Sequence, residues 1–312
     1  IGNSSGDPAA LAIGTNDYVL TSDGTDIAWE AAGGGGITYK SEGTNFTNSL
    51  IIGHDTTGTL STATYNTAVG LTALSAITTG DHNVAIGSGA MDALTEGYQS
   101  VGIGHNALGA MTTHGENVAI GYDALSSVTG AVSGNTAVGA NAGKVVTGIG
   151  NTCVGTNATS SSATWNTIIG HSAGHTANTG GENVYVGVHA GSAATSGDQN
   201  VYIGGYAGYA STTNAENVAI GYDALRTTTT GHVTWDGVVA VGYEALKDQN
   251  DSAERNTAIG YQAFANLTSQ GASTAVGHRA GDAMTTGSMC TLIGAAAGGT
   301  AVDPIGLTAL GY

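Results

Sequence analysis

A short motif that recurs about every 17 residues constrains the fold of this chain more than any other feature. The motif reads Asn-Thr/Val-Ala-Val/Ile-Gly, followed by two variable residues and an Ala, as in residues 83–90. Its glycine, called here the anchor glycine, occurs in 16 copies, and 10 of the 15 intervals between copies are 17 residues long. The anchor glycines are Gly53, Gly70, Gly87, Gly104, Gly121, Gly139, Gly155, Gly170, Gly187, Gly204, Gly221, Gly242, Gly260, Gly277, Gly294 and Gly311. A regular period of this length indicates a repeat architecture in which each unit packs on its neighbours.

Each position of the repeat has a physical interpretation. The residue before the anchor glycine is Val, Ile or Leu in every copy, and the residue two places earlier is Thr, Val or Leu. This period of two is typical of a short β-strand with one buried face, and we expect the aliphatic pair to point inward. The glycine ends the strand where a positive φ or a close backbone contact excludes a Cβ. The Ala three residues later, present in every copy from Ala73 to Ala297, predicts a confined inward position.

A 17-residue unit is too short for two helices and a loop, whereas it fits one coil of a solenoid whose strands stack in parallel. We therefore predict an all-β fold, a parallel β-solenoid or β-roll of about 16 coils. Asn stands at the start of the strand in 10 of the 16 copies, and stacked Asn side chains can hydrogen-bond along such a ladder. The hexapeptide β-helix and the calcium-binding nonapeptide roll are excluded because the chain contains neither repeat pattern.

Composition excludes several classes of partner. Charged residues make up 9% of the chain, and the formal net charge is −17. Nucleic-acid binding requires clusters of Lys and Arg. The chain has only six such residues and no cluster of them, so we expect no nucleic-acid partner. No apolar run reaches the ~18 residues of a membrane span, so we expect no membrane insertion. The low charge also fits the stacking, because a charge repeated in successive coils would meet its own copy. In one column Glu182, Gln199 and Glu216 alternate acid with amide.

The sequence divides into three segments. Residues 1–32 lie outside the repeat and are expected to form an N-terminal linker or attachment segment. Residues 33–46 begin with four glycines and form a joint and lead-in that is flexible by composition. The β-solenoid repeat domain covers residues 47–312. Because the repeat stops just after an anchor glycine without a polar capping unit, we expect further chain or a partner to cover that end.

The repeat resembles the head domains of trimeric autotransporter adhesins of the YadA type, whose units read Asn-Ser-Val-Ala-Ile-Gly followed by an Ala-rich return. Residues 83–87 and 217–221 match this unit closely, and the resemblance covers about 85% of the chain. It implies a left-handed parallel β-roll in a homotrimer, with the chains side by side or intertwined. The family unit is shorter than 17 residues, so the cross-section of the coil is expected to differ.

A second resemblance concerns the N-terminal segment. Residues 18–24, followed by Ala28 and Trp29, look like a linker common in bacteriophage tail-fibre proteins. This resemblance favours the structural shaft of a phage tail fibre or similar surface appendage on a virion, presenting or contributing to host-receptor attachment. Its partners would be two further copies of the chain, other virion or appendage proteins at both ends, and a host-surface glycan or protein receptor. The alternatives are an autotransporter-type adhesin head on a bacterial surface that binds matrix or glycans, and a glycan-degrading tailspike.

We expect neither enzymatic activity nor a cofactor or metal. Glycosidase chemistry requires two carboxylates that face one groove, whereas the acids of this chain are scattered over turns. The spacing of His171 and His175 would suit a metal only on a helix, and this stretch is expected to be a turn. Cys153 and Cys290 are too far apart in the stack to form a disulfide and are expected to be small buried residues.

Two features are candidates for contact with a receptor or glycan. The position after the anchor glycine is Tyr or His in nine copies, namely His54, His105, Tyr122, His171, Tyr222, Tyr243, Tyr261, His278 and Tyr312. We interpret this column as a stacked ladder that shields a coil edge or a subunit seam, with an aromatic stripe for glycans as the alternative. The widest interval, from Gly221 to Gly242, inserts a loop, and insertions in solenoids often bind ligands. The candidate contact residues are therefore His232, Trp235 and Tyr243.

Overall fold

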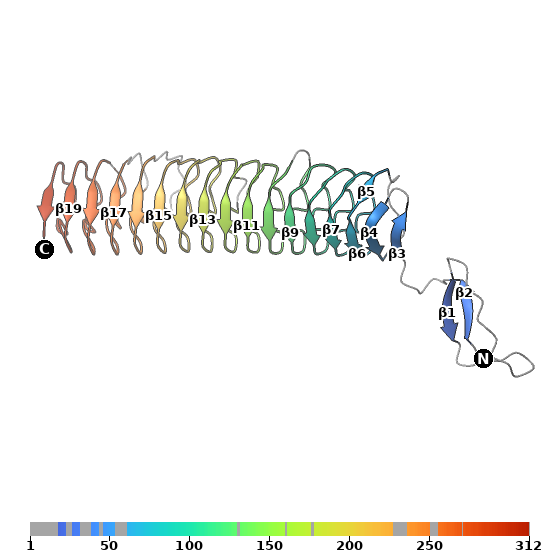
Figure 1. Ribbon diagram of the computed structural model, residues 1–312. Helices are drawn as coiled ribbons and strands as arrows, with labels where there is room; N and C mark the ends of the chain where they lie inside the picture. Colours follow the sequence, from blue (N-terminus) through green and yellow to red (C-terminus); the bar gives the residue numbers. More distant parts are fainter. Residues whose placement is uncertain are drawn as a thin grey trace, which may run out of the picture.

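The computed structural model describes residues 18–22, 27–31, 39–43, 46–53, 61–129, 132–159, 161–175, 178–226, 236–249, 255–269 and 271–311. Over these residues the fold is all-β, and 16 parallel strands stack into a β-solenoid with the 17-residue repeat, as the sequence predicts (Figure 1). None of the described segments forms a helix long and apolar enough to cross a membrane.

The N-terminal strands differ from the rest. β1 (Tyr18–Ser22) and β2 (Ile27–Ala31) pair antiparallel in a two-stranded sheet of their own. β3 (Tyr39–Gly43) pairs antiparallel with β4 (Phe46–Ile52), which is the first strand of the parallel ladder, and β5 (Ala63–Thr64) pairs with the beginning of β4. The lead-in segment therefore places a strand along the outer edge of the first coil, where an unpaired edge would otherwise be exposed.

Each later coil contributes one strand of three residues, paired in register with the strands of the coils before and after it. These strands are β6 (Thr67–Val69), β7 (Val84–Ile86), β8 (Val101–Ile103), β9 (Val118–Ile120), β10 (Thr136–Val138), β11 (Thr152–Val154), β12 (Thr167–Ile169), β13 (Val184–Val186), β14 (Val201–Ile203), β15 (Val218–Ile220), β16 (Val239–Val241), β17 (Thr257–Ile259), β18 (Thr274–Val276), β19 (Thr291–Ile293) and β20 (Thr308–Leu310). Every pairing from β4–β6 to β19–β20 is parallel and joins equivalent positions of the repeat.

The anchor glycine is required for the two reasons that the sequence suggests. Gly70 has a φ of +140°, a conformation that side chains disfavour. A Cβ at this position would also lie 2.6 Å from the carbonyl carbon and oxygen of Gly87 in the next coil. The same close approach recurs along the stack, so a side chain in this column would push neighbouring coils apart.

The buried face of the strands is the opposite of the one predicted. In β9 the middle residue, Ala119, is fully buried, whereas Val118 is half-buried and Ile120 is 37% exposed. The same pattern holds in the other three-residue strands up to β19, so the expectation that the aliphatic pairs point inward was wrong. The physical reason is the thinness of the coil. Its interior is shared with the Ala column and with a second column of apolar side chains, which leaves most strands room for one small residue.

Two columns of side chains fill the interior of the coil. The first is the middle residue of each strand, and the second is the residue four positions after the anchor glycine. In seven coils the middle residue of the strand is Ala or Gly and the residue four positions after the anchor glycine is large, as with Ala219 and Leu225. In two coils both residues are small, Ala137 with Gly143 and Ala275 with Gly281, and side chains of neighbouring coils lie against these glycines. In four coils the middle residue is large and the second position is Gly. The pairs are Ile168 with Gly174, Tyr185 with Gly191, Tyr202 with Gly208, and Leu292 with Gly298. A Cβ on Gly208 would lie 2.4 Å from two carbons of the Tyr202 ring, so each large residue occupies the space that its partner gives up.

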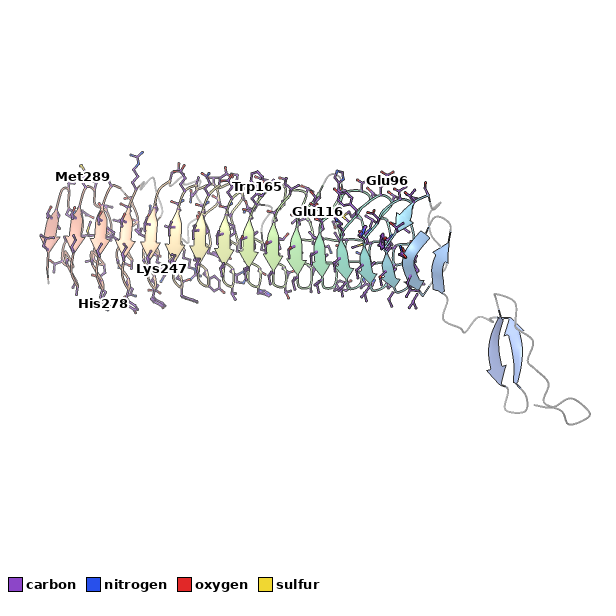
Figure 2. All side chains as sticks on the ribbon, in the orientation of Figure 1. Glu96, Glu116, Trp165, Lys247, His278 and Met289 are labelled. Carbon is purple, nitrogen blue, oxygen red and sulfur yellow. The ribbon has the colours of Figure 1, made fainter. Side chains whose placement is uncertain are left out.

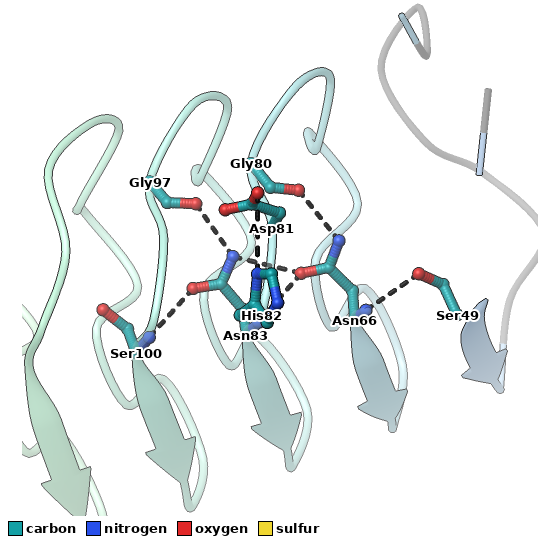
Figure 3. Close-up of polar contacts among 8 residues, drawn as sticks. All are labelled: Ser49, Asn66, Gly80, Asp81, His82, Asn83, Gly97 and Ser100. Atoms are coloured by element: carbon teal, nitrogen blue, oxygen red, sulfur yellow. Dashed lines mark hydrogen bonds and ion pairs between the residues drawn. The ribbon is translucent and has the colours of Figure 1, made fainter. Parts of the chain in front are cut away.

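The buried Asn column forms a hydrogen-bond ladder along the rod, as predicted (Figure 3). The backbone N–H and Nδ2 of Asn83 both donate to Oδ1 of Asn66, at 3.0 and 3.1 Å. Nδ2 of Asn83 also donates to the carbonyl of Gly97 at 2.8 Å, in the return turn of the same coil. Asn83 therefore ties the start of its strand to the previous coil and to its own return turn, as do Asn135, Asn151 and Asn200 in theirs, so these buried amides are hydrogen-bonded.

Candidate functional site

Three surfaces run along the solenoid and could meet a partner. The sheet face is formed by the outward residues of the strands, the first and third of each three-residue strand. The start edge is the side on which the strands begin, and the end edge is the side on which they end. Figure 2 shows Trp165 and Met289 on the start edge and His278 on the opposite, end edge.

The sheet face carries an unbroken aliphatic column over its whole length. The third residue of each strand is aliphatic without exception: Ile52, Val69, Ile86, Ile103, Ile120, Val138, Val154, Ile169, Val186, Ile203, Ile220, Val241, Ile259, Val276, Ile293 and Leu310. The first residue is Thr or Val except for its equivalent in β4, Leu50. At ~4.8 Å per strand and about 10 Å per strand width, this face covers on the order of 700 Å². Soluble monomers rarely expose a contiguous apolar patch above a few hundred Å².

The end edge carries the stacked aromatic column that the sequence predicts. The rings of Tyr222, Tyr243, Tyr261 and His278 stack in this order, with centroids 5.9, 5.1 and 5.2 Å apart and planes inclined by 12°, 9° and 9°. Both faces of the Tyr243 ring are therefore covered by its neighbours. Contact of a receptor with Tyr243 stays a prediction, and it would have to use the edge and hydroxyl of the ring, because no open face remains for a sugar.

A ladder of charged and amide groups accompanies this column. Nε2 of Gln262 donates to Oε2 of Glu244 at 2.7 Å, and Nε of Arg279 donates to Oε1 of Gln262 at 3.0 Å. Lys247 pairs with the other oxygen of Glu244 at 3.2 Å. The hydrogen bond from Gln262, with that from Lys247, lowers the pKa of Glu244, and the charge of Glu244 in turn raises the pKa of the Tyr243 hydroxyl. Acid, amide and base follow one another in successive coils, so no like charges stack here.

The structure describes only some of the remaining candidate residues. His232 and Trp235 lie outside the described residues, as do His54 and Tyr312 of the aromatic column. Cys153 and Cys290 are both buried, as predicted. In the part of the chain that the structure describes, no group of three or more His, Cys, Asp and Glu side chains could hold a metal ion.

Sequence reasoning missed one prominent residue on the start edge. Trp165 is 60% exposed and occupies the position immediately before the Asn of the ladder. The next two coils have Glu182 and Gln199 at this position, and the two preceding coils have Gly134 and Gly150. A bulky aromatic residue directly after two glycines in one repeat column is the signal that could have identified it.

Comparison with known proteins gives this chain no family. The sequence matches no family model, and neither a curated protein nor a solved structure is similar to it.

Proposed function

We propose that this chain is the shaft of a homotrimeric fibre, in a phage tail fibre or similar surface appendage, and that it presents or contributes to host-receptor attachment. The sheet face is the observation that carries this proposal. Its third column is never polar in 16 strands, although Ile86, Ile203 and Ile259 are 39%, 38% and 41% exposed in the isolated chain. Strand propensity favours β-branched residues, but a column open to water would also admit Thr, as the first strand column does in eight copies, whereas the third column is aliphatic in every copy.

The partner that fits this face is another copy of the same chain. The outward side chains repeat at the spacing of the parallel ladder, and an identical chain offers the same spacing over the same length. Rung-by-rung packing of identical faces buries every copy equally, which closed rotational symmetry requires. Three copies rather than two follow from the resemblance of the repeat to trimeric head domains.

A shaft also follows from how the coils hold together. Each coil bonds to the next through the strand ladder, the Asn ladder and the carbonyls of the return turns, as in the bond from the Thr78 N–H to the Thr95 carbonyl at 3.0 Å. These bonds lie along the rod, and each coil contacts mainly its neighbours, as in other solenoids. Such a rod resists bending and holds an attached tip at a distance.

The solution mass of the chain tests the assembly. Light scattering or sedimentation should give about three times the 30.5 kDa of one chain. Ile120→Lys combined with Ile203→Lys places charges on the sheet face and should shift the protein toward monomers, because an unpaired charge cannot be buried in an apolar seam. The matched control is Val145→Lys with Ile149→Lys, since these side chains are 45% and 39% exposed but lie off the three-residue strands.

The result that contradicts the proposal is a wild-type monomer at micromolar concentration, or equal dissociation of both double variants. Location needs a separate measurement. Immunogold labelling of intact virions and of bacterial cells should place the chain on particles. Labelling only of bacterial envelopes would favour the adhesin over the phage fibre.

A further inference from the structure

We propose that the start edge around Trp165 is a binding site for neutral oligosaccharides, with the indole as the platform and Glu182, Asp198 and Gln199 as hydrogen-bond partners of the sugar hydroxyls.

Trp165 is a large aromatic side chain that the fold leaves open to solvent. Its φ of +55° is shared by other residues of this column, such as Glu182 at +58° and Met289 at +56°, so this backbone conformation belongs to the coil and not to Trp165 alone. The side chain is 60% exposed, so little of the indole is used to pack the core. Exposed Trp side chains, which combine an apolar ring with a polar N–H, are characteristic of binding surfaces.

The indole is held in place by the coil before it. A Cβ at Gly150 would lie 2.5 Å from Cδ1 and 2.9 Å from Nε1 of Trp165, so the ring lies against the bare backbone at Gly150 and a side chain there would displace it. The backbone N–H of Trp165 donates to the carbonyl of Ile149 at 3.0 Å, and the Ile149 side chain is itself 39% exposed. Trp165 is thus a fixed apolar platform, in contrast to Tyr243, whose ring faces are covered.

A polar hollow of about 340 Å³ begins beside this platform. Thr164, the residue before Trp165, lines it, and so does Glu182, which occupies the Trp165 column one coil further on. Two hydrogen bonds fix its acids: Nε2 of Gln199 donates to Oε2 of Glu182 at 3.0 Å, and the N–H of Gly181 donates to Oδ1 of Asp198 at 2.7 Å. Each bond uses one oxygen of its carboxylate and orients the other as an acceptor.

This combination matches the chemistry of an uncharged pyranose. The C–H face of the ring can lie on the indole, while vicinal hydroxyls donate to the fixed carboxylates and to the Gln199 carbonyl oxygen. Glu182 and Asp198, in a chain of net charge −17, disfavour sialic acids and other anionic sugars. The position of the site on the start edge leaves the sheet face available for assembly (Figure 2).

Titration of the full chain with maltotriose, cellotriose, chitotriose and a β-galactotriose tests the site, with sialyllactose as the anionic probe. The chain has three Trp residues, so Trp29→Phe with Trp235→Phe leaves Trp165 as the only tryptophan, whose emission is followed by selective excitation of indole over the 13 Tyr residues. At least one neutral sugar should change its emission saturably, with a dissociation constant on the order of 1 mM. By calorimetry, Trp165→Ala should weaken this binding about tenfold or more, and Glu182→Gln with Asp198→Asn several-fold.

Met289→Ala is the matched control, because Met289 occupies the same repeat column with a φ of +56° and 63% exposure. It should leave binding unchanged. The proposal is overturned if no neutral sugar saturates, if binding survives Trp165→Ala in a variant with wild-type circular dichroism, or if sialyllactose binds as well as the neutral sugars. These readouts are independent of the mass measurement, so failure of this site and failure of the fibre assignment can be told apart.

Discussion

The paired sizes of the two interior columns lead to a quantitative prediction for Tyr202 and Gly208. Tyr202 is fully buried, stacks on Tyr185 with centroids 5.2 Å apart, and its hydroxyl lies 2.6 Å from Oγ of Ser211. Tyr202→Ala removes this ring from a coil that cannot collapse, and should cost about 3–5 kcal/mol. Gly208→Leu alone forces a side chain into the ring and should cost about 1–3 kcal/mol for overpacking and a further ~1 kcal/mol for the left-handed backbone.

The double variant should be far more stable than the sum of these changes. With Ala at position 202 and Leu at position 208, the coil reproduces the arrangement of Ala219 and Leu225 in the next coil, and Leu225 itself has a φ of +51°. Ser211 keeps a partner, because Nδ2 of Asn214 donates to its hydroxyl at 3.0 Å. We expect a net cost of about 1–2 kcal/mol and therefore a favourable coupling of roughly 3 kcal/mol or more between the two sites.

Guanidinium unfolding followed by far-UV circular dichroism measures this cycle, with each midpoint compared at equal protein concentration. The mismatched control is Tyr202→Ala with Gly191→Leu, which places the Leu one coil away, against the ring of Tyr185. It should show no rescue. If the matched double variant loses as much stability as the two single variants added together, positions 202 and 208 do not share one enclosed volume.

Two further predictions concern the polar columns. Asn200 accepts from the Asn217 N–H at 3.1 Å and donates to the Asn214 carbonyl at 2.7 Å, so Asn200→Ala should cost about 2–4 kcal/mol in guanidinium unfolding. Asn200→Ser should cost less, because Ser100 fills this column in another coil; equal costs would show that the ladder contributes little. Hydrogen bonds from Lys144 and Asn106 lower the pKa of Asp123 below its ordinary 3.8, so the stability it contributes is complete above that value and is lost as the pH falls further. The guanidinium midpoint of unfolding should therefore decrease as the pH is lowered below about 4, and Asp123→Asn should remove part of that decrease. If the variant and the wild type show the same pH profile, this assignment is contradicted.

The sequence predicts most of the fold because each coil repeats the same local constraints. The period, the anchor glycines, the Ala column and the Asn ladder are all confirmed, since each depends on backbone geometry or on contact between equivalent residues. The direction of the strand faces was wrong for a different reason. Ile120 and Ala119 are both apolar, and hydrophobicity alone does not tell the interior of a coil from the outward face of its sheet. The reciprocal sizes of residues such as Tyr202 and Gly208 contain that information, because only residues that share one enclosed space need to compensate each other.

The candidate site was harder to predict than the fold. Tyr243 was singled out because aromatic residues recur in its column, but recurrence itself stacks the rings and covers their faces. Trp165 lies in a column whose residue type changes along the chain, and a search for repeated features overlooks such a position. The contact of its ring with Gly150 of the coil before it becomes evident only in the structure.

Sixteen copies of one unit in a single chain allow the constraints on each column to be compared under identical conditions. The anchor column is always Gly because the backbones of successive coils nearly touch. In eleven coils the two interior columns hold one large and one small residue, because both share one enclosed volume. The third strand column varies only among Val, Ile and Leu although several of its residues are exposed in the isolated chain, and this constraint is the one that the proposed assembly would impose. The column of Trp165 ranges over Gly, Ala, Asn, Glu, Gln, Arg, His, Tyr, Met and Trp, so neither the fold nor the proposed assembly requires any one residue there. An exposed indole that lies against Gly150 in such a column is therefore explained by the proposed sugar site and not by the needs of the coil.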